Sequence, residues 1–191
     1  VIAVSSGDAT GAIVIGSDSG GNTIGPDNAI TVATSGGGLL YSVHIATPGD
    51  NTITGNTIVG GKRGVQIDGG STGTTTITGN HISNGGPVDN MTYGIGANAG
   101  DLVITGNTLL NTVRPVEFFG VHDVTMTSNV LNGSNYFGVN CGSFSGAVAI
   151  NNCSFLSING NAISNQTTTV VDGELNWWGS ATGPTHSGNP G

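Results

Sequence analysis

The stretch NTITGNTI, residues 51–58, combines alternating Thr and Ile with a central Gly-Asn pair. A period of two is typical of a β-strand, and Gly-Asn is typical of a tight turn. Similar stretches return as TTITGNHI at 75–82, LVITGNTL at 102–109, VTMTSNVL at 124–131 and LSINGNAI at 156–163. The chain is therefore an internal repeat of short strands joined by turns.

A second motif alternates with the first and supplies another strand. It reads SVHI at 42–45, GVQI at 64–67, GIGA at 94–97, PVEF at 115–118 and GVNC at 138–141. A unit of this length cannot bury its own apolar face, but stacked units bury a continuous core. The pattern predicts an all-β fold, a single parallel β-helix (β-solenoid) of about six or seven rungs with two or three short strands each.

The repeated asparagine is expected to be structural. Equivalent residues of stacked rungs lie about 4.8 Å apart, so each amide can bond to the amides above and below it. The predicted ladder contains Asn56, Asn80, Asn107, Asn129 and Asn161. Its register is open near the end, because Cys153 in VAINNCSF also fits the asparagine position.

Composition excludes two classes of partner. The 191 residues include 3 Lys and Arg against 11 Asp and Glu, which gives a net charge of −8. Binding to nucleic acid or anionic membranes by charge requires clustered basic residues, so neither is expected. No window of about 18 apolar residues predicts a transmembrane helix. The absence of an initiator Met and of a basic leader favours a processed form or a domain of a larger protein.

The repeats resemble the right-handed parallel β-helix repeat of the pectin-lyase-like superfamily. The segment ELNWWGSATGPTH, Glu174–His186, is similar to the closing motif of β-helix modules in large secreted bacterial and archaeal surface proteins. The resemblance extends from about Gly11 to Pro184 and implies a right-handed β-helix outside the cell or on its surface. The fold hosts lyases, hydrolases, epimerases, adhesins and inert spacers, so it leaves the activity open.

One domain, 1–191, is expected. Residues 1–27 would form an N-terminal rung or cap, 28–170 the stacked rungs, and 171–191 a C-terminal cap and the start of a linker. The ends of a solenoid need caps. Trp177 and Trp178 are therefore expected to cover the open end of the core, with a sugar-stacking platform as the alternative.

Stacking converts the second motif into columns of side chains. Its outward positions are His44, Gln66, Gly96, Glu117 and Asn140. Two residues before the core position come Tyr41, Arg63, Tyr93, Arg114 and Phe137, which include both arginines of the chain. Arginines between aromatic rings form cation–π stacks, and rings and planar polar groups suit carbohydrate. The predicted ligand-binding residues are Tyr41, His44, Arg63, Gln66, Tyr93, Arg114 and Glu117, with an ordinary solvated sheet face as the alternative.

Catalysis is a second hypothesis. Hydrolysis by acid and base groups needs two carboxyls roughly 5 to 10 Å apart, and Glu117 and Asp68 are the candidates. The chain shows no signature of pectate lyase, pectin methylesterase, polygalacturonase or alginate epimerase. A longer loop between Asn80 and Gly94, with His81 and Asp89 on or beside it, is a further place for a site or simply a surface insertion.

The two cysteines, Cys141 and Cys153, favour one disulfide, with two buried free thiols as the alternative. No metal site and no cofactor are predicted, because two unpatterned Cys and scattered His do not form a zinc motif. Asp50, Asp101 and Asp123 share a turn position and are expected to be turn caps.

The expected function is an extracellular module that binds glycans or adheres, or a rigid segment of a larger protein. The expected partner is a polysaccharide or cell-surface glycan. A polysaccharide-processing enzyme is the runner-up. Thr-x-Thr pairs on the asparagine-bearing strands, such as Thr52 and Thr54, leave an ice-binding face as a third possibility.

Overall fold

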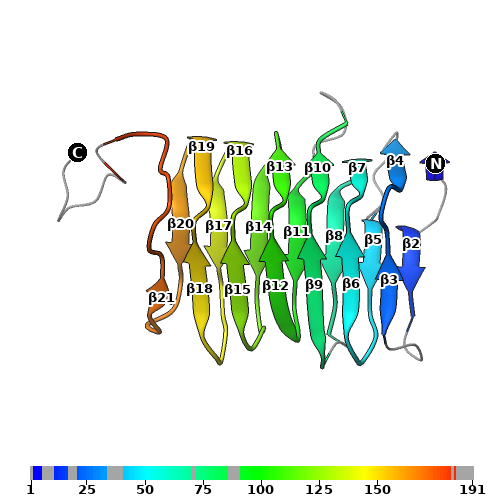
Figure 1. The fold of residues 1–191 in the computed structure, drawn as a ribbon, viewed down its shortest axis with the longest axis horizontal. Helices are drawn as coiled ribbons and strands as arrows, with labels where there is room; N and C mark the ends of the chain where they lie inside the picture. Colours follow the sequence, from blue (N-terminus) through cyan, green and yellow to red (C-terminus); the bar gives the residue numbers. More distant parts are fainter. Residues whose placement is uncertain are drawn as a thin grey trace.

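The computed structural model describes residues 2–5, 11–16, 21–33, 41–69, 72–85, 91–181 and 183. The regular elements of these residues are β-strands, arranged in three parallel sheets of seven strands each. The strands of each sheet lie side by side along the long axis, with β2 and β21 near opposite ends (Figure 1). None of the described residues belongs to a helix long and apolar enough to cross a membrane.

Each rung contributes one strand to each sheet. Sheet A contains β1 (Ile2–Ser5), β4 (Ala29–Ala33), β7 (Thr57–Gly60), β10 (His81–Ser83), β13 (Thr108–Leu110), β16 (Val130–Ser134) and β19 (Ser154–Ile158). Sheet B contains β2 (Gly11–Ile15), β5 (Tyr41–Ile45), β8 (Arg63–Ile67), β11 (Tyr93–Ala97), β14 (Arg114–Phe118), β17 (Phe137–Cys141) and β20 (Asn161–Asn165). Sheet C contains β3 (Asn22–Ile24), β6 (Asn51–Thr54), β9 (Thr74–Thr78), β12 (Asp101–Thr105), β15 (Val124–Thr127), β18 (Val148–Asn151) and β21 (Val171–Asp172).

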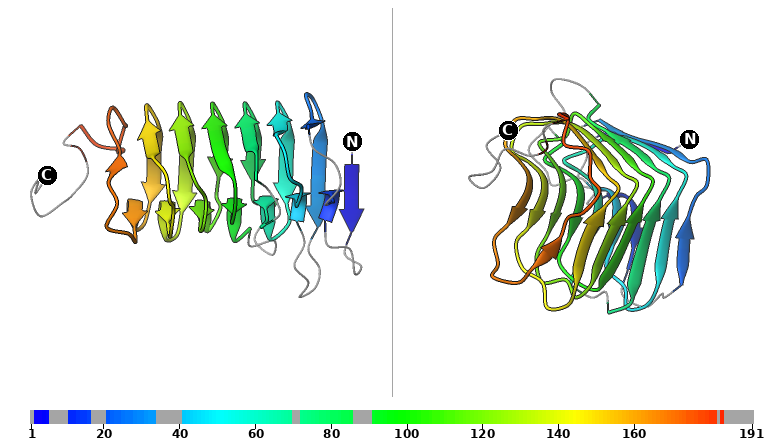
Figure 2. Two further views of the ribbon diagram at one scale, coloured as in Figure 1. Left: turned by 90° about the horizontal axis from the view of Figure 1, so that it is seen from below. Right: turned by 60° about the vertical axis from the view of Figure 1, so that its left-hand side comes forward.

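The predicted parallel β-helix is therefore confirmed, with three strands in each rung. The views of Figure 2 show the sheets wrapped around a common interior, which is the continuous core that stacking was expected to bury.

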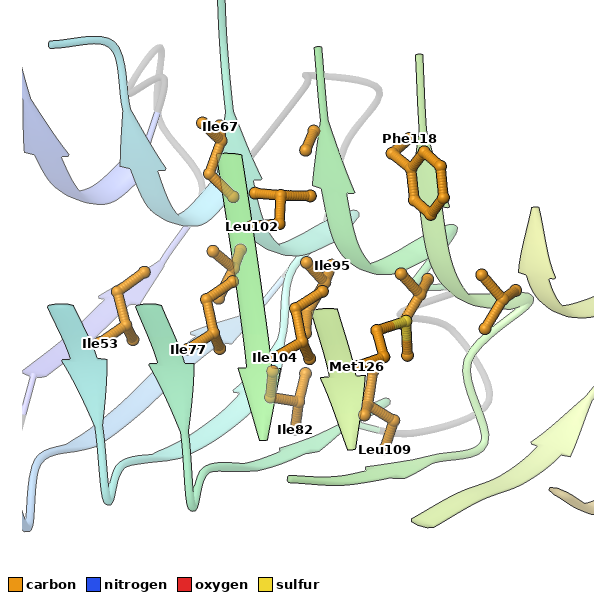
Figure 3. Close-up of a cluster of buried hydrophobic side chains, with 14 of the residues drawn as sticks. Ile53, Ile67, Ile77, Ile82, Ile95, Leu102, Ile104, Leu109, Phe118 and Met126 are labelled. Carbon is orange, nitrogen blue, oxygen red and sulfur yellow. The ribbon is translucent and has the colours of Figure 1, made fainter. Parts of the chain in front are cut away.

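Apolar side chains form rows inside the stack because equivalent strand positions pair in register. Ile53, Ile77, Ile104 and Met126 are consecutive partners in sheet C and have no solvent exposure. Figure 3 shows this row, with Ile82 and Leu109 of sheet A beside it. The alternation of Ile with Thr thus reports which face of each strand is buried.

The asparagine ladder occupies the turn between sheets C and A. The side-chain Nδ2 of Asn56 donates to Asn80 Oδ1 at 3.0 Å, and the same bond links Asn80 to Asn107 and Asn107 to Asn129, also at 3.0 Å. Each Nδ2 also donates to a carbonyl of the preceding rung, such as Asn107 to Ile77 O at 2.8 Å. These buried amides therefore have partners, as buried polar groups require.

The prediction that Asn161 belongs to this ladder is wrong. Asn161 begins β20 in sheet B, where it pairs with Phe137. Cys153 takes the ladder position instead: Asn129 Nδ2 contacts Cys153 Sγ at 3.7 Å, and Cys153 N donates to Asn176 Oδ1 at 2.8 Å. The ladder thus ends on Asn176, inside the ELNWWG segment.

The predicted disulfide is not formed: Cys141 and Cys153 are free, buried thiols. Cys141 ends β17, whereas Cys153 follows β18, a strand of four residues that lies between them along the chain. Cys141 pairs with Phe118 and Asn165 in sheet B, whereas Cys153 lies in the ladder turn between sheets C and A, so the two thiols belong to different parts of the rung.

The last described rung carries the two tryptophans. Trp178 stacks on Phe155 with ring centroids 5.1 Å apart and packs against the core, as the capping interpretation requires. Trp177 differs, because it is 48% exposed while its backbone pairs with Ser154. The segment from Pro184 onward, predicted as the exit to a linker, lies outside the described residues.

Candidate functional site

A stack of alternating rings and guanidinium groups runs along sheet B. Tyr41, Arg63, Tyr93 and Arg114 begin β5, β8, β11 and β14 and pair in that order. The Arg63 guanidinium carbon lies 5.5 Å from the Tyr41 ring centroid and 4.9 Å from that of Tyr93. This is the cation–π arrangement that the column predicted.

Arg114 extends the stack by a residue that the column did not include. Its guanidinium carbon lies 5.5 Å from the Tyr93 centroid and 5.6 Å from that of Tyr136. The sequence predicted Phe137 at this place, but the ring that Arg114 contacts is that of its neighbour Tyr136. All three tyrosines of the chain therefore belong to one stack with both arginines.

The outward column beside this stack forms a polar floor. His44, Gln66, Gly96, Glu117 and Asn140 pair in register, as predicted. Gln66 is 1% exposed, Glu117 7% and Asn140 2%, so the column is sunk between its neighbours rather than spread on a solvated face.

Hydrogen bonds fix most of this floor. Arg63 Nη1 donates to Gln66 Oε1 at 2.7 Å, and Gln66 Nε2 donates to Asp68 Oδ1, also at 2.7 Å. Asp68 further accepts from Asn98 Nδ2 at 3.1 Å and lies 2.7 Å from His44 Nε2. The floor is thus a connected network that holds its planar groups in fixed orientations.

A hollow of about 170 Å³ opens where Gly96 interrupts the floor. Its lining combines Arg63, Gln66, Tyr93, Gly96, Ala97, Asn98, Glu117 and Phe119. A Cβ at Gly96 would lie 2.5 Å from Gln66 Oε1, so glycine leaves room for the Gln66 side chain and for the hollow. Phe119, 40% exposed, adds a second aromatic side chain to the lining besides Tyr93.

The two candidate catalytic carboxylates are both engaged. Arg114 Nη1 donates to Glu117 Oε2 at 2.9 Å and to Oε1 at 3.2 Å. Asp68 is held by His44, Gln66 and Asn98 as described. Glu117 of β14 lines the hollow, whereas Asp68, which directly follows β8, is outside its lining and contacts the lining residues Gln66 and Asn98.

Four of the predicted ligand-binding residues line the hollow, namely Arg63, Gln66, Tyr93 and Glu117. Arg114 lies beside it and binds Glu117. Tyr41 and His44 belong to the rung before, where they pair with Arg63 and Gln66. Sequence reasoning did not assign Asn98 or Phe119 to the site. Both lie in the file two residues after the outward column, which also contains Ala46, Asp68 and Gly142; the repeat offsets placed this file beside the predicted residues, but no ligand contact was assigned to Asn98 or Phe119.

Two other predicted features lie elsewhere. His81 begins β10 in sheet A, away from the sheet B column, and Asp89 lies outside the described residues. The threonine files are in register on sheet C, where Thr52 pairs with Thr76 and Thr54 with Thr78. The files continue through Val103 and Thr105 of β12 and Thr125 and Thr127 of β15. They then reach Ala149 and Asn151 of β18, because β18 rather than the repeat at 156–163 supplies the next sheet C strand.

The comparisons with known proteins agree with this architecture. The family model described as "Right handed beta helix region" matches residues 5–174. No curated protein and no solved structure matches the chain significantly. Because the family match covers most of the chain and the three parallel sheets have the expected form, the chain belongs to the right-handed β-helix family.

Proposed function

We propose that the chain is a glycan-binding module whose site is the sheet B groove centred on Gly96. The observation that carries this proposal is the composition of the hollow: two aromatic faces, two side-chain amides, a carboxylate and a guanidinium converge on about 170 Å³. Aromatic faces stack on sugar rings, while planar amide and carboxylate groups bond to hydroxyls. The hollow is small for a whole ligand, so it would hold one unit of a longer chain.

The charges favour an acidic sugar such as a uronate. Glu117 neutralises Arg114 through two hydrogen bonds. Among the described residues Arg63 forms no ion pair, and its side chain donates a hydrogen bond to the neutral Gln66. Arg63 therefore retains a positive charge at the edge of the hollow, where a carboxylate can accept its N–H groups.

The long axis of the stack fits a polymer. The floor, the cation–π stack and the outer file of Asp68, Asn98 and Phe119 all run from rung to rung along the β-helix. A polysaccharide chain lying in the groove would contact the same files in successive rungs. We accordingly place the module outside the cell or on its surface, as part of a larger bacterial or archaeal protein.

Affinity gel electrophoresis tests the proposal with polygalacturonate and alginate gels beside neutral hydroxyethylcellulose gels. The test variant is Arg63→Gln and the matched control is Lys62→Gln, which removes the same charge from the adjacent residue. A charge-assisted hydrogen bond contributes about 1.5–3 kcal/mol, so Arg63→Gln should weaken binding to uronate by roughly tenfold or more. Lys62→Gln should leave binding nearly unchanged.

Three other outcomes of the gel experiment would contradict or change the proposal. Equal weakening by both variants would mean non-specific attraction to charge. Retardation with shortening of the polymer would support the enzyme hypothesis, with Glu117 and Asp68 as the residues to replace. The absence of retardation in every gel would refute glycan binding for these polymers and favour a rigid structural segment.

A further inference from the structure

Three potential metal ligands meet at the start of two adjacent sheet C strands, away from the sheet B groove. Asp101 is the first residue of β12, and His122 and Asp123 directly precede β15, its partner in the sheet. His122 Nδ1 lies 3.1 Å from Asp101 Oδ1 and 3.3 Å from Asp123 Oδ2. One donor atom from each residue falls within 4.8 Å of the other two.

These separations fit one coordinated ion. Zinc binds His nitrogen and Asp oxygen at about 2.0–2.2 Å, so neighbouring ligands of a tetrahedral zinc lie roughly 3.4 Å apart. The two distances from His122 Nδ1 are already close to that value. The two carboxylate oxygens lie within 4.8 Å of each other and would move closer when they bind the ion.

Backbone groups orient the two carboxylates. Asp101 Oδ1 accepts from Asp123 N at 3.0 Å, and Asp123 Oδ1 accepts from Ala147 N at 2.6 Å. The second bond comes from the next rung and leaves Asp123 Oδ2 as the oxygen that faces His122. Partners of this kind hold ligands in the geometry that a metal requires.

The donor set also selects the ion. One imidazole nitrogen with two carboxylate oxygens suits zinc and its neighbours, whereas calcium takes six to eight oxygen ligands. Two carboxylates beside one imidazole carry a net negative charge when the imidazole is neutral. The side chains are 40% to 60% exposed, so an ion reaches them from solvent and keeps water in its remaining position.

We propose that Asp101, His122 and Asp123 form a zinc-type divalent metal site that staples two consecutive rungs together. No metal centre was expected from the sequence, because Cys and His spacing gave no motif. Only the register of β12 with β15 brings an aspartate 21 residues away to the His-Asp pair.

Isothermal titration calorimetry with Zn²⁺ in a non-chelating buffer tests this site, and thermal unfolding with and without Zn²⁺ gives a second readout. The test variants are His122→Ala and Asp101→Asn. The matched control is Asp50→Asn, because Asp50 holds the same turn position and its Oδ1 accepts from Thr74 N at 2.9 Å. Asp50 therefore reproduces the turn cap of Asp101 in a rung whose equivalent turn has no histidine.

The wild-type chain should bind one Zn²⁺ and show a Tm that rises with Zn²⁺ concentration above the Kd. Loss of an outer-shell partner alone weakens metal binding 10- to 100-fold, so loss of the ligand His122 should weaken it by at least about 100-fold. Asp50→Asn should bind as the wild type does. The absence of one-site binding, or its survival in folded His122→Ala, would overturn the proposal.

Discussion

At the scale of single residues, Cys153 interrupts the asparagine ladder and weakens its hydrogen bonding at that step. At each step from Asn56 to Asn129 an amide oxygen accepts from the backbone N–H and the Nδ2 of the preceding asparagine, as Asn129 Oδ1 does from Asn107 at 2.9 and 3.0 Å. At position 153 the acceptor is a thiol sulfur at 3.7 Å. Sulfur is a weak acceptor, so this step stabilises the fold less than the others do.

Replacing Cys153 with Asn should therefore raise the free energy of unfolding by about 1 kcal/mol. The new Oδ1 would accept from Asn129, and the new Nδ2 would lie in place to donate to the carbonyl of Met126, as Asn129 Nδ2 does to Ile104 O at 2.7 Å. Urea unfolding measures the effect as a higher midpoint with an unchanged slope. Cys153→Ala is the control, and an Asn variant no more stable than it would contradict the ladder argument.

The second residue-scale prediction concerns pH. Burial raises the pKa of the Cys141 thiol from its ordinary value of 9.0 to about 12, because the thiolate would lose its hydration. Below pH 9 the thiol is neutral in both the folded and unfolded states, so it has no effect on the pH dependence. Between pH 9 and 12 the unfolded chain ionises and the folded chain does not, so stability should fall as pH rises.

Reaction with Ellman's reagent at pH 8 checks that the two thiols are buried and free. The native protein should react slowly, and both cysteines should react after unfolding in urea without a reductant. Two reactive thiols in the unfolded chain also distinguish the free state from a disulfide, which would give none. Cys141→Ala should flatten the loss of stability above pH 9.

At the scale of elements, β8, β11 and β17 of sheet B each begin with a ring or guanidinium residue that is followed by a glycine. A Cβ at Gly94 in β11 would meet Leu109 Cδ2 and Pro115 O, each at 2.7 Å. Leu109 belongs to sheet A, so the strand starts of sheet B fit closely against the core side of sheet A.

Gly94→Ala should therefore cost about 1–3 kcal/mol of stability, as overpacking of a well-packed core does. Gly69→Ala is the matched control, because nothing lies within 4 Å of a Cβ built there and its backbone is not left-handed. Urea unfolding of both variants measures the difference. A Gly94→Ala protein as stable as the control would mean that the rungs can separate without cost.

The strands themselves were predictable from local sequence. The alternation of apolar and polar residues specifies which face of a strand is buried, and the Gly-Asn turns specify where it ends. The register near residues 141–161 was not, because Cys153 and Asn161 compete for one template and only pairing with the next rung decides. The same limit applies to the site: the columns, including the file that contains Phe119, could be derived from repeat offsets, but Tyr136 rather than Phe137 contacts Arg114 through a side-chain direction that no spacing specifies. The His122 cluster depends on register in the same way.

At the scale of the whole molecule, a solenoid is stabilised by contacts between neighbouring rungs, so its ends are its weakest points. The stacking of Trp178 on Phe155 at 5.1 Å closes one end of the row of core side chains. Trp177, on the same segment, directs about half of its surface to solvent. The two adjacent tryptophans therefore have different structural consequences.

Trp178→Ala should lower the free energy of unfolding by about 1–3 kcal/mol, since it removes a partly buried aromatic contact. Trp177→Ala keeps the backbone bonds to Cys153 and Phe155 and should cost much less. Hydrogen exchange would locate the effect, because contacts in a solenoid pass only between neighbours. In Trp178→Ala the amides of β19 and β20 should lose protection while those of β8 and β11 keep it. Loss of protection along the whole stack would instead mean that the rungs unfold as a single cooperative unit, in which case the C-terminal cap stabilises the distant sheet B groove as well.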